Sequence, residues 1–320
     1  MAQAPIQFDR ASGALEGANL WERTAALALA TGSKISSHFS HRGYISCANL
    51  LRKMLPERNI AIKLNEGAVF EFPYGDGYWS KLLNRSYNYE DELELLFRHS
   101  ADVDYTLIDC GANYGYWSVL VSSAPFGSHR VIAIEPSSQN FPKLANNARA
   151  NGGRFELMKC AIGAAKGTAR LSGKKHEAFS IAGGVNGGGE EVPVIALDDL
   201  IEDGKVSPGG KYLIKLDVEG LEVDAIKGGT RLLQGDSVII CEEHGNDSDH
   251  TVSRYILEQT PLKLIVYDPR SNRLETVTEL SILDRIKVST HVGYNVFGTQ
   301  SAFWQNRINA LNADAARRMQ

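Results

Sequence analysis

A glycine-punctuated turn stands where an apolar run of the sequence ends in an acidic residue. Residues 107–115 read LIDCGANYG, so Asp109 is followed by Gly111, Asn113 and Gly115. A turn of this kind after a strand binds a nucleotide-like cofactor, either a dinucleotide or S-adenosylmethionine. A pyrophosphate pressed against the backbone requires glycine where Asn113 stands, whereas the amino-acid end of S-adenosylmethionine needs polar donors and acceptors. The turn therefore favours the methyl donor.

Two further segments could complete a cofactor site. Glu135 ends the apolar run RVIAIE, and a carboxylate at the end of the next strand can accept hydrogen bonds from both hydroxyls of a ribose. Both cofactors carry that ribose, so Glu135 alone does not distinguish them. Cys160 and Ala161 end the run FELMKCA and are expected beside the adenine. The alternative role of Asp109 and Glu135 is helix capping and hydrogen bonding within loops.

Candidate catalytic groups follow two later apolar runs. Asp217 ends KYLIKLD, and Glu242, Glu243 and His244 end DSVIICEEH. Ligands of open α/β sheets bind at the carboxyl ends of the strands, so Asp217, Glu242 or His244 could serve as a general base there. The same three side chains could instead bind a divalent ion that acidifies an acceptor hydroxyl. A structural role for His244 is an equal alternative, and metal dependence stays open.

These groups can meet only if a parallel sheet brings them to one edge. From residue 105 onward, apolar runs alternate with helix-sized segments, which is typical of an α/β fold with a parallel sheet covered on both faces. The last two runs, 262–268 and 291–298, lack a convincing helix between them and predict an antiparallel pair at an edge. A glycine-rich stretch within 173–190 predicts a loop, whose Lys174 and His176 could close over an acceptor or could simply be solvated.

The first part of the chain has a different pattern. Residues 1–84 predict an N-terminal extension of helices and a small hairpin, acting as a cap or an oligomer contact. Residues 85–300 would form the main domain, and residues 301–320 a C-terminal helix or tail. The opening dozen residues and the last nine are expected to be frayed or loosely docked.

Several segments together resemble the FkbM family of S-adenosylmethionine-dependent methyltransferases. They read IDCGANYGYWS, AIEPSSQNFPKLANNARAN, VIALDDL and IKLDVEGLEVDAIKGG, and the resemblance extends over about residues 85–245. The resemblance implies a Rossmann-like fold with a mostly parallel seven-stranded sheet and an antiparallel edge strand. It also implies methyl transfer to a hydroxyl of a sugar or secondary metabolite. By position, Asp109, Gly111, Asn113 and Gly115 would hold the methionine portion, and Glu135 the ribose.

Composition narrows the class of partner. The 320 residues are 22% charged and 43% hydrophobic with a net charge of −4, which is ordinary for a globular enzyme and lacks the basic excess of nucleic-acid-binding proteins. No apolar run is long enough to span a membrane, and no signal peptide is evident. The sequence predicts a cytoplasmic enzyme acting on a small molecule or a glycan. The four cysteines have no metal-site spacing and are interpreted as structural thiols.

Two other functions stay open at this point. An NAD-dependent oxidoreductase or epimerase would need a phosphate-binding turn, and Asn113 argues against one. A non-catalytic cofactor-binding protein of the same fold would be expected to lose its cofactor residues first, and here they are intact. Neither the acceptor nor the position methylated follows from the sequence.

Overall fold

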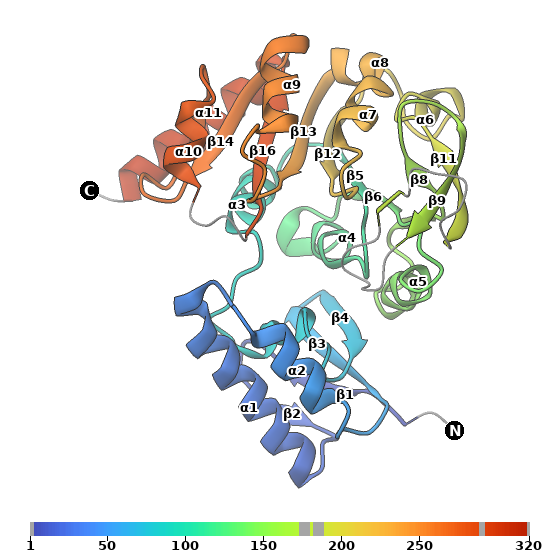
Figure 1. Ribbon diagram of the computed structural model, residues 1–320, viewed down its shortest axis with the longest axis vertical. Coiled ribbons are helices and arrows are strands. Elements are labelled where there is room, and N and C mark those ends of the chain that lie inside the picture. Colours follow the sequence, from blue (N-terminus) through green and yellow to red (C-terminus); the bar gives the residue numbers. More distant parts are fainter. Residues whose placement is uncertain (1–2, 173–179, 182–188, 288–291, 319–320) are drawn as a thin grey trace.

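A computed structural model describes residues 3–172, 180–181, 189–287 and 292–318 (Figure 1). Lys174, His176 and most of the glycine-rich stretch therefore lie outside the described residues. Within the described part, no helix is both long and apolar enough to cross a membrane.

An eight-stranded sheet forms the centre of the fold, in the order β15-β14-β16-β13-β12-β5-β6-β7. The strands are β5 (Thr106–Cys110), β6 (Arg130–Ile134), β7 (Glu156–Met158), β12 (Lys211–Leu216), β13 (Asp236–Glu243), β14 (Lys263–Asp268), β15 (Arg273–Thr276) and β16 (Tyr294–Thr299). The five from β13 to β7 run parallel, while β16 is antiparallel to both β13 and β14. The Rossmann-like α/β sheet and the antiparallel pairing of the last two apolar runs are confirmed. Strand β15 adds an eighth strand to the seven expected.

Helices cover both faces of this sheet, because successive strand residues point to opposite sides. Leu107 belongs to one buried cluster and Ile108 to the other. The first cluster contains α3 (Asp91–His99), α4 (Tyr116–Val121), α5 (Phe141–Ala150) and α11 (Ala302–Arg318). The second contains α6 (Asp199–Glu202), α7 (Glu222–Lys227), α8 (Thr230–Gln234), α9 (Thr251–Gln259) and α10 (Ser281–Ile286).

A small second sheet flanks the main one. It has the order β10-β9-β11-β8, with β8 (Ala161–Ile162), β9 (Gly167–Ser172), β10 (Ser180–Ile181) and β11 (Glu190–Ile195). The run 154–163 reads as one strand in the sequence, but the chain leaves the main sheet after β7 and continues as β8, which pairs with β11. This change of sheet brings Ala161 to the edge where the cofactor turn lies.

The N-terminal part forms a sheet of its own, in the order β2-β1-β3-β4. Strands β3 (Asn59–Asn65) and β4 (Ala68–Pro73) make the expected hairpin. The expectation that the opening dozen residues are frayed is wrong, because β1 (Ile6–Asp9) pairs in parallel with β3 and Ile6 is fully buried. Strand β2 (Leu15–Glu16) completes the sheet. A four-residue strand gives too short an apolar alternation to be recognised without its partner.

Helices α1 (Leu20–Ser36) and α2 (Tyr44–Arg52) and the short 3-10 helices η1 (Ser37–Phe39) and η2 (Trp79–Leu83) accompany the N-terminal sheet (Figure 1). A reciprocal capping box between Asn19 and Glu22 begins α1. Glu22 also forms a buried ion pair with Arg58 at 3.1 Å. At the other end of the chain, the predicted tail forms the end of α11, where Asn312 exchanges two hydrogen bonds with the backbone of Leu274.

Two asparagines, one on α5 and one directly after it, join the N-terminal sheet to the main domain. The Asn147 amide accepts from the N–H of Glu71 at 2.6 Å and donates to its carbonyl at 2.9 Å, and it also donates to the carbonyl of Tyr114. One turn further, Asn151 makes the same reciprocal pair with Val69 at 3.0 and 2.7 Å. The edge strand β4 is thus covered by side-chain amides that replace a neighbouring strand.

We predict that Asn147→Ala lowers the free energy of unfolding by about 2–4 kcal/mol, because it leaves buried backbone groups of β4 without partners. Urea denaturation followed by circular dichroism measures this. The neighbouring Asn146 accepts a hydrogen bond from Arg149 and forms none with β4 in the described structure, so Asn146→Ala should change stability by less than about 0.5 kcal/mol. Equal losses in the two variants would show that the junction does not depend on these hydrogen bonds.

Candidate active site

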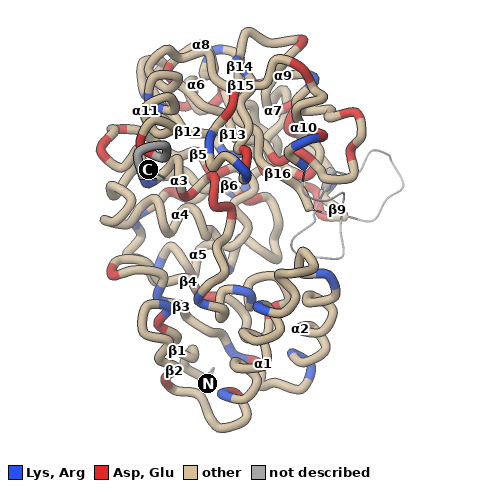
Figure 2. The backbone as a smooth tube through the Cα atoms, turned by 90° about the vertical axis from the view of Figure 1, so that its left-hand side faces the viewer, with Lys and Arg blue, Asp and Glu red and all other residues tan. Residues whose placement is uncertain are grey.

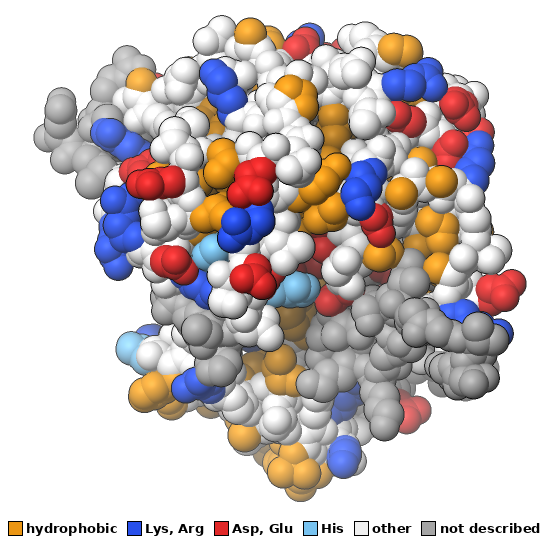
Figure 3. All heavy atoms as spheres, turned by 45° about the horizontal axis from the view of Figure 1, so that its top comes forward, with side chains coloured by type: hydrophobic (Ala, Val, Ile, Leu, Met, Phe, Trp, Pro, Cys, Tyr) orange, Lys and Arg blue, Asp and Glu red, His pale blue; other side chains and the backbone are white. Residues whose placement is uncertain are grey.

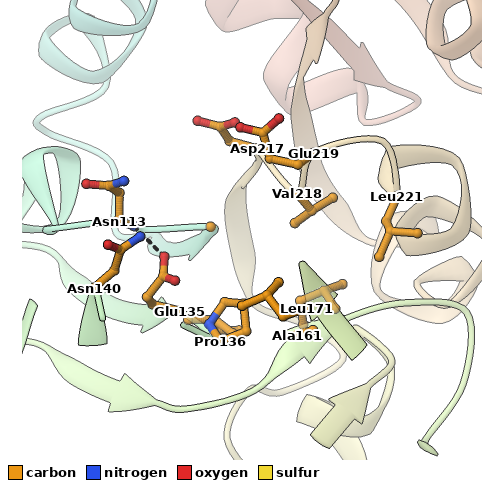
Figure 4. A pocket seen from close by; sticks show the side chains of 13 residues that line it. Asn113, Glu135, Pro136, Asn140, Ala161, Leu171, Asp217, Val218, Glu219 and Leu221 are labelled. Carbon is orange, nitrogen blue, oxygen red and sulfur yellow. Dashed lines mark hydrogen bonds between the residues drawn. The ribbon is translucent and has the colours of Figure 1, made fainter. Parts of the chain in front are cut away.

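A narrow cavity opens at the carboxyl ends of β5, β6 and β12, beside the small flanking sheet (Figure 4). Its polar wall comes from the turn after β5 and from the ends of β6 and β12. The small flanking sheet contributes apolar side chains to the opposite wall. The lining residues are Gly111, Asn113, Ile134, Glu135, Pro136, Asn140, Ala161, Ile162, Leu171, Asp217, Val218, Glu219 and Leu221.

The turn after β5 has a backbone shape that its sequence requires. Gly111 has a φ of +78°, and a Cβ atom there would lie 1.8 Å from the carbonyl oxygen of Asp217. Asn113 also has a positive φ, of 52°, which asparagine tolerates better than most residues. Its side-chain oxygen accepts hydrogen bonds from the N–H of Tyr114 at 2.9 Å and from the indole of Trp79 at 3.3 Å. The turn is therefore held close to the end of β12, with no room for a larger residue at position 111.

The carboxyl group of Glu135 lines the cavity and is held there by two backbone amides. One oxygen accepts from the N–H of Asn113 at 2.8 Å and the other from the N–H of Ser137 at 2.9 Å (Figure 4). Each oxygen keeps a second lone pair that can accept a hydrogen bond from a ligand hydroxyl. Burial raises the pKa of Glu135 to about 7, although the two amide hydrogen bonds oppose the shift. The carboxyl group is thus preorganised for a diol.

Four of the seven predicted cofactor residues line the cavity: Gly111, Asn113, Glu135 and Ala161. The other three are absent from its lining. Asp109 is buried within β5 and accepts a hydrogen bond from Ser118 Oγ at 2.6 Å. Gly115 precedes α4, where a Cβ would lie 2.5 Å from the side chain of Leu144. Cys160 is buried just before β8, and burial raises the pKa of its thiol to about 11.

The charge of the cavity distinguishes between ligand classes. Among the described residues that line it, three carry carboxyl groups, Glu135, Asp217 and Glu219, and none is Lys, Arg or His. A pyrophosphate would meet only like charges there. A ligand with a sulfonium and an ammonium group would meet opposite ones. The wall of Pro136 and the flanking-sheet residues offers a surface for an adenine ring, so the residues present fit S-adenosylmethionine.

A buried lysine lies at the centre of the strand ends. Lys215 of β12 is 5% exposed, and its ammonium group forms an ion pair with Asp217 at 2.7 Å. Asp109 stands opposite Lys215 in the register of β5 and β12. Burial opposes the charge of Lys215, but the nearby carboxylates of Asp217, Glu90 and Asp109 together raise its pKa. The lysine therefore stays positive among several acids.

A second and larger cavity, of about 590 Å³, lies between the N-terminal part and the sheet. Its walls combine tyrosine rings, acidic groups and a small basic end. Its residues are Ser40, His41, Ile45, Tyr78, Lys81, Tyr87, Asn88, Tyr89, Glu90, Asp91, Glu92, Glu242, Tyr267, Pro269, Ile286, Val292, Gly293, Tyr294 and Asn295. Part of this wall is held in place by Asn295, which donates to Glu90 at 3.2 Å and to Glu92 at 2.8 Å.

Each cavity is lined by an acidic residue from the end of one of two adjacent strands, β12 and β13. Leu216 pairs with Cys241 in these parallel strands, so Asp217 and Glu242 leave adjacent strands at the same level. Asp217 lines the first cavity and Glu242 the second. In the described structure the Glu242 carboxyl group has no hydrogen bond or ion pair. Burial, followed by the charges of Asp217 and Glu90, raises its pKa well above the ordinary value.

The other residues of this edge have different surroundings. His244 is exposed and lines neither cavity. Glu243 is buried and accepts two hydrogen bonds from Ser253, at 2.8 and 2.6 Å, near the start of α9. Glu222 accepts from the backbone N–H groups of Val218 and Gly220. Within the described ranges, no three His, Cys, Asp or Glu side chains are grouped to hold a metal ion, so Asp217, Glu242 and His244 do not converge on one.

Residues 109–260 match the family model described as a methyltransferase FkbM domain. This region, just under half of the chain, is similar to an FkbM methyltransferase domain. The matched residues include the cofactor turn, Glu135 and both acidic strand ends that face the two cavities. The match supports S-adenosylmethionine as cofactor, and it favours methyl transfer over the NAD-dependent alternative.

The chain is also similar to a curated relative and to solved structures. The chain is 25% identical over 169 residues to the hexuronic acid methyltransferase AglP of Haloferax volcanii, covering 53% of this chain and 68% of that protein. It also resembles a methyltransferase FkbM structure from Methylobacillus flagellatus, with 17% identity, a TM-score of 0.40 and coverage of 69% of this chain but only 46% of the other. The O-methyltransferase TomG of Streptomyces achromogenes, solved with SAM, gives 11% identity and a TM-score of 0.38, covering 67% and 82% of the two chains. Because both TM-scores are below 0.5, the assignment rests on the sequence match.

Sequence reasoning missed Lys215 and Glu90. Lys215 lies inside the apolar run KYLIKLD, two residues before Asp217, and a lysine buried between apolar residues was the available signal. Glu90 precedes α3 with a positive φ of 52° and accepts a hydrogen bond from the Trp117 indole at 2.5 Å. Its importance depends on the fold, which brings it to the second cavity beside Glu242.

We predict that Glu135 makes folding stability depend on pH. Its folded pKa of about 7 exceeds the ordinary 4.5, so its contribution is complete below pH 4.5 and is lost as the pH rises through 7. Between pH 5 and pH 8 the wild-type chain should lose up to about 3 kcal/mol relative to Glu135→Gln, which cannot titrate. Urea denaturation of both proteins at the two pH values measures the difference. Parallel pH dependences would contradict the assignment.

Proposed function

We propose that this chain is an S-adenosylmethionine-dependent O-methyltransferase that methylates a hydroxyl of a sugar-containing or secondary-metabolite acceptor. The observation that carries the proposal is that Asp217 and Glu242, at the same level of two adjacent strands, each line one of two cavities. One has an acidic lining that suits a cationic methyl donor, and the other is larger and lined by tyrosines and acids. The name of the relative, a hexuronic acid methyltransferase, supports an acceptor of the sugar type.

The proposed cofactor site follows the walls of the first cavity. Glu135 would accept hydrogen bonds from the ribose hydroxyls, and Ala161 and its neighbours would contact the adenine. The turn of Gly111 and Asn113 would hold the methionine portion. Asp109, Gly115 and Cys160 support that turn and the adenine wall from behind, by a hydrogen bond to Ser118 in the case of Asp109.

The proposed acceptor site is the second cavity. Its tyrosine rings can pack against the apolar faces of a sugar ring, and their hydroxyl groups and the carboxyl groups can pair with sugar hydroxyls. S-adenosylmethionine supplies an electrophilic methyl group, and alignment with the acceptor oxygen provides much of the rate. The protein residues must then hold the acceptor and remove its proton.

Glu242 is the proposed general base. Its carboxyl group faces the acceptor cavity without a protein partner, and its raised pKa brings it closer to the pH at which a base works best. The acceptor proton would move to Glu242 as the new oxygen–methyl bond forms. Asp217 is held by Lys215 and faces the donor cavity, so we assign it a positioning role toward the positive end of the donor. His244 is exposed outside both cavities, and we propose no proton transfer through it.

We predict that Glu135→Ala weakens binding of S-adenosylmethionine by tenfold or more, the loss expected for charge-assisted hydrogen bonds. Isothermal titration calorimetry with S-adenosylmethionine and its demethylated product measures this. Glu191→Ala is a suitable control, because Glu191 is an exposed carboxylate on β11 that lines neither cavity. If the wild-type chain binds neither compound, the proposed function is wrong.

We predict that Glu242→Gln lowers kcat by about 10²–10⁴-fold, the usual contribution of a general base, while the affinity for S-adenosylmethionine stays unchanged. Transfer of a labelled methyl group, with products identified by mass spectrometry, measures the rate. The wild-type rate should rise with pH as Glu242 loses its proton, with a midpoint well above 4.5. The Gln variant should lack that rise.

Two comparison variants sharpen this test. His244→Asn should retain at least about half of the activity, because surface changes away from a site have small effects. Asp217→Asn should weaken donor binding as well as turnover. A large loss in His244→Asn together with a small one in Glu242→Gln would assign the base to the histidine instead.

A further inference from the structure

The N-terminal helices expose an unusual amount of apolar surface. Nine large hydrophobic side chains are exposed among the described residues, and seven of them lie between residues 20 and 54. Their exposed fractions run from 44% to 82%. They are Leu20, Trp21, Leu27, Ile35, Phe39, Leu50 and Met54. Such a concentration on one small unit marks an interaction surface rather than ordinary scatter.

Several of these side chains lie on the same side of the two N-terminal helices. Leu20, Leu27 and Ile35 recur at helical spacing on α1, and the opposite side of α1 is buried against the N-terminal sheet. Leu50 lies in the last turn of α2, and Met54 follows two residues after the helix ends. The Trp21 indole donates to the carbonyl of Met54 at 3.3 Å, which places the start of α1 beside the end of α2. We call the exposed side of residues 20–54 the helical face. Figure 3 shows hydrophobic side chains gathered at the lower edge of the molecule, where these helices lie.

The exposed charged side chains of the helical face are basic. Five basic residues occur in this segment: Arg23, Lys34, Arg42, Arg52 and Lys53. All are exposed, and none forms an ion pair within the described structure. The acidic residue of the segment is Glu22, which is buried and paired with Arg58. In Figure 2 the blue positions of Lys and Arg predominate along α2. The face is thus basic on a chain whose net charge is −4.

An open hollow beside α1 continues the basic surface. It is lined by Arg10, Lys34 and Arg85, together with small polar and apolar residues, and no acidic residue contributes to it. Arg10 and Arg85 are fixed by hydrogen bonds to backbone carbonyl groups of Tyr87 and Arg10, respectively. Their positive charges are therefore held at the rim of the helical face, and neither guanidinium group forms an ion pair with a carboxylate within the described residues.

We infer that the helical face docks on an anionic lipid surface. Helices that lie in the plane of a membrane interface combine Trp, Phe and Leu on one side with Lys and Arg at the borders, and they bind anionic lipids most strongly. A second copy of the chain is a poorer occupant, because a twofold contact would bring ten basic groups together without acids between them. The lipid phosphates supply the opposite charge, and the interface accommodates the apolar side chains.

This arrangement would orient the enzyme at the lipid surface. Ser40, His41 and Ile45 belong to the same segment and line the second cavity. The wall of the proposed acceptor site and the helical face are thus two sides of one unit.

Co-sedimentation of the full chain with vesicles tests the inference. We expect binding to vesicles of equal parts phosphatidylglycerol and phosphatidylcholine to be at least about tenfold tighter than to phosphatidylcholine alone, and to weaken as salt rises. Arg52→Ser with Lys53→Ser should weaken binding by about 30-fold, given the usual contribution of each basic group near an anionic surface. Leu27→Ser with Leu50→Ser should abolish it.

A matched control tests whether vesicle binding depends on where the basic residues lie or only on the net charge of the chain. Arg231→Ser with Arg254→Ser removes the same two charges from exposed sites on α8 and α9 and should leave vesicle binding within about twofold. Circular dichroism verifies that each variant is folded. The inference is overturned if wild type binds both vesicles equally or not at all, or if the control weakens binding as much as the α2 variant. It is also overturned if the leucine variant abolishes self-association in ultracentrifugation but leaves vesicle binding intact.

Discussion

One buried ammonium group constrains the centre of this protein. Lys215 forms an ion pair with Asp217 and stands opposite Asp109 in the register of the sheet. It also interacts electrostatically with the carboxylate of Glu90, which precedes α3. Carboxylates in a low-dielectric environment repel one another strongly unless a cation lies between them. A slip of β12 by one residue would turn the lysine to the other face of the sheet. The strand register, the cofactor turn and the approach to α3 therefore depend on a single charge.

Short-range patterns were enough to predict four of the residues that line the first cavity. Gly111 and Glu135 could be recognised because each directly follows or ends an apolar run, and the carboxyl ends of parallel strands meet at one edge. The core strands were predicted for the same reason. Ala161 followed from the third run, although the chain changes sheet there. The sequence did not predict that Asp109 is buried, because its hydrogen-bond donor Ser118 comes close only when α4 packs against the sheet.

The second cavity, where we propose that the acceptor binds, was less predictable because its residues come from distant parts of the chain. Glu90 and Glu242 share a cavity only after the N-terminal part has packed on the sheet. That packing uses reciprocal hydrogen bonds from Asn147 and Asn151 to β4, and an asparagine on a helix gives no local sign of such a role. Strand β1 was missed for a similar reason, since its partner β3 lies far along the sequence.

Carboxyl groups outnumber cationic groups near the two cavities, so the protonation of these carboxyl groups should depend on whether a ligand is bound. Glu135, Glu90 and Glu242 all have raised pKa values, in each case chiefly because they are buried. A cationic ligand lowers the pKa of nearby carboxyl groups. In the proposed reaction Glu242 would therefore be ionised most readily while a sulfonium is close, when it must accept a proton. Its affinity for that proton would rise once the sulfonium charge is lost with the methyl group. The acidic walls would thus favour proton transfer in the direction of methylation.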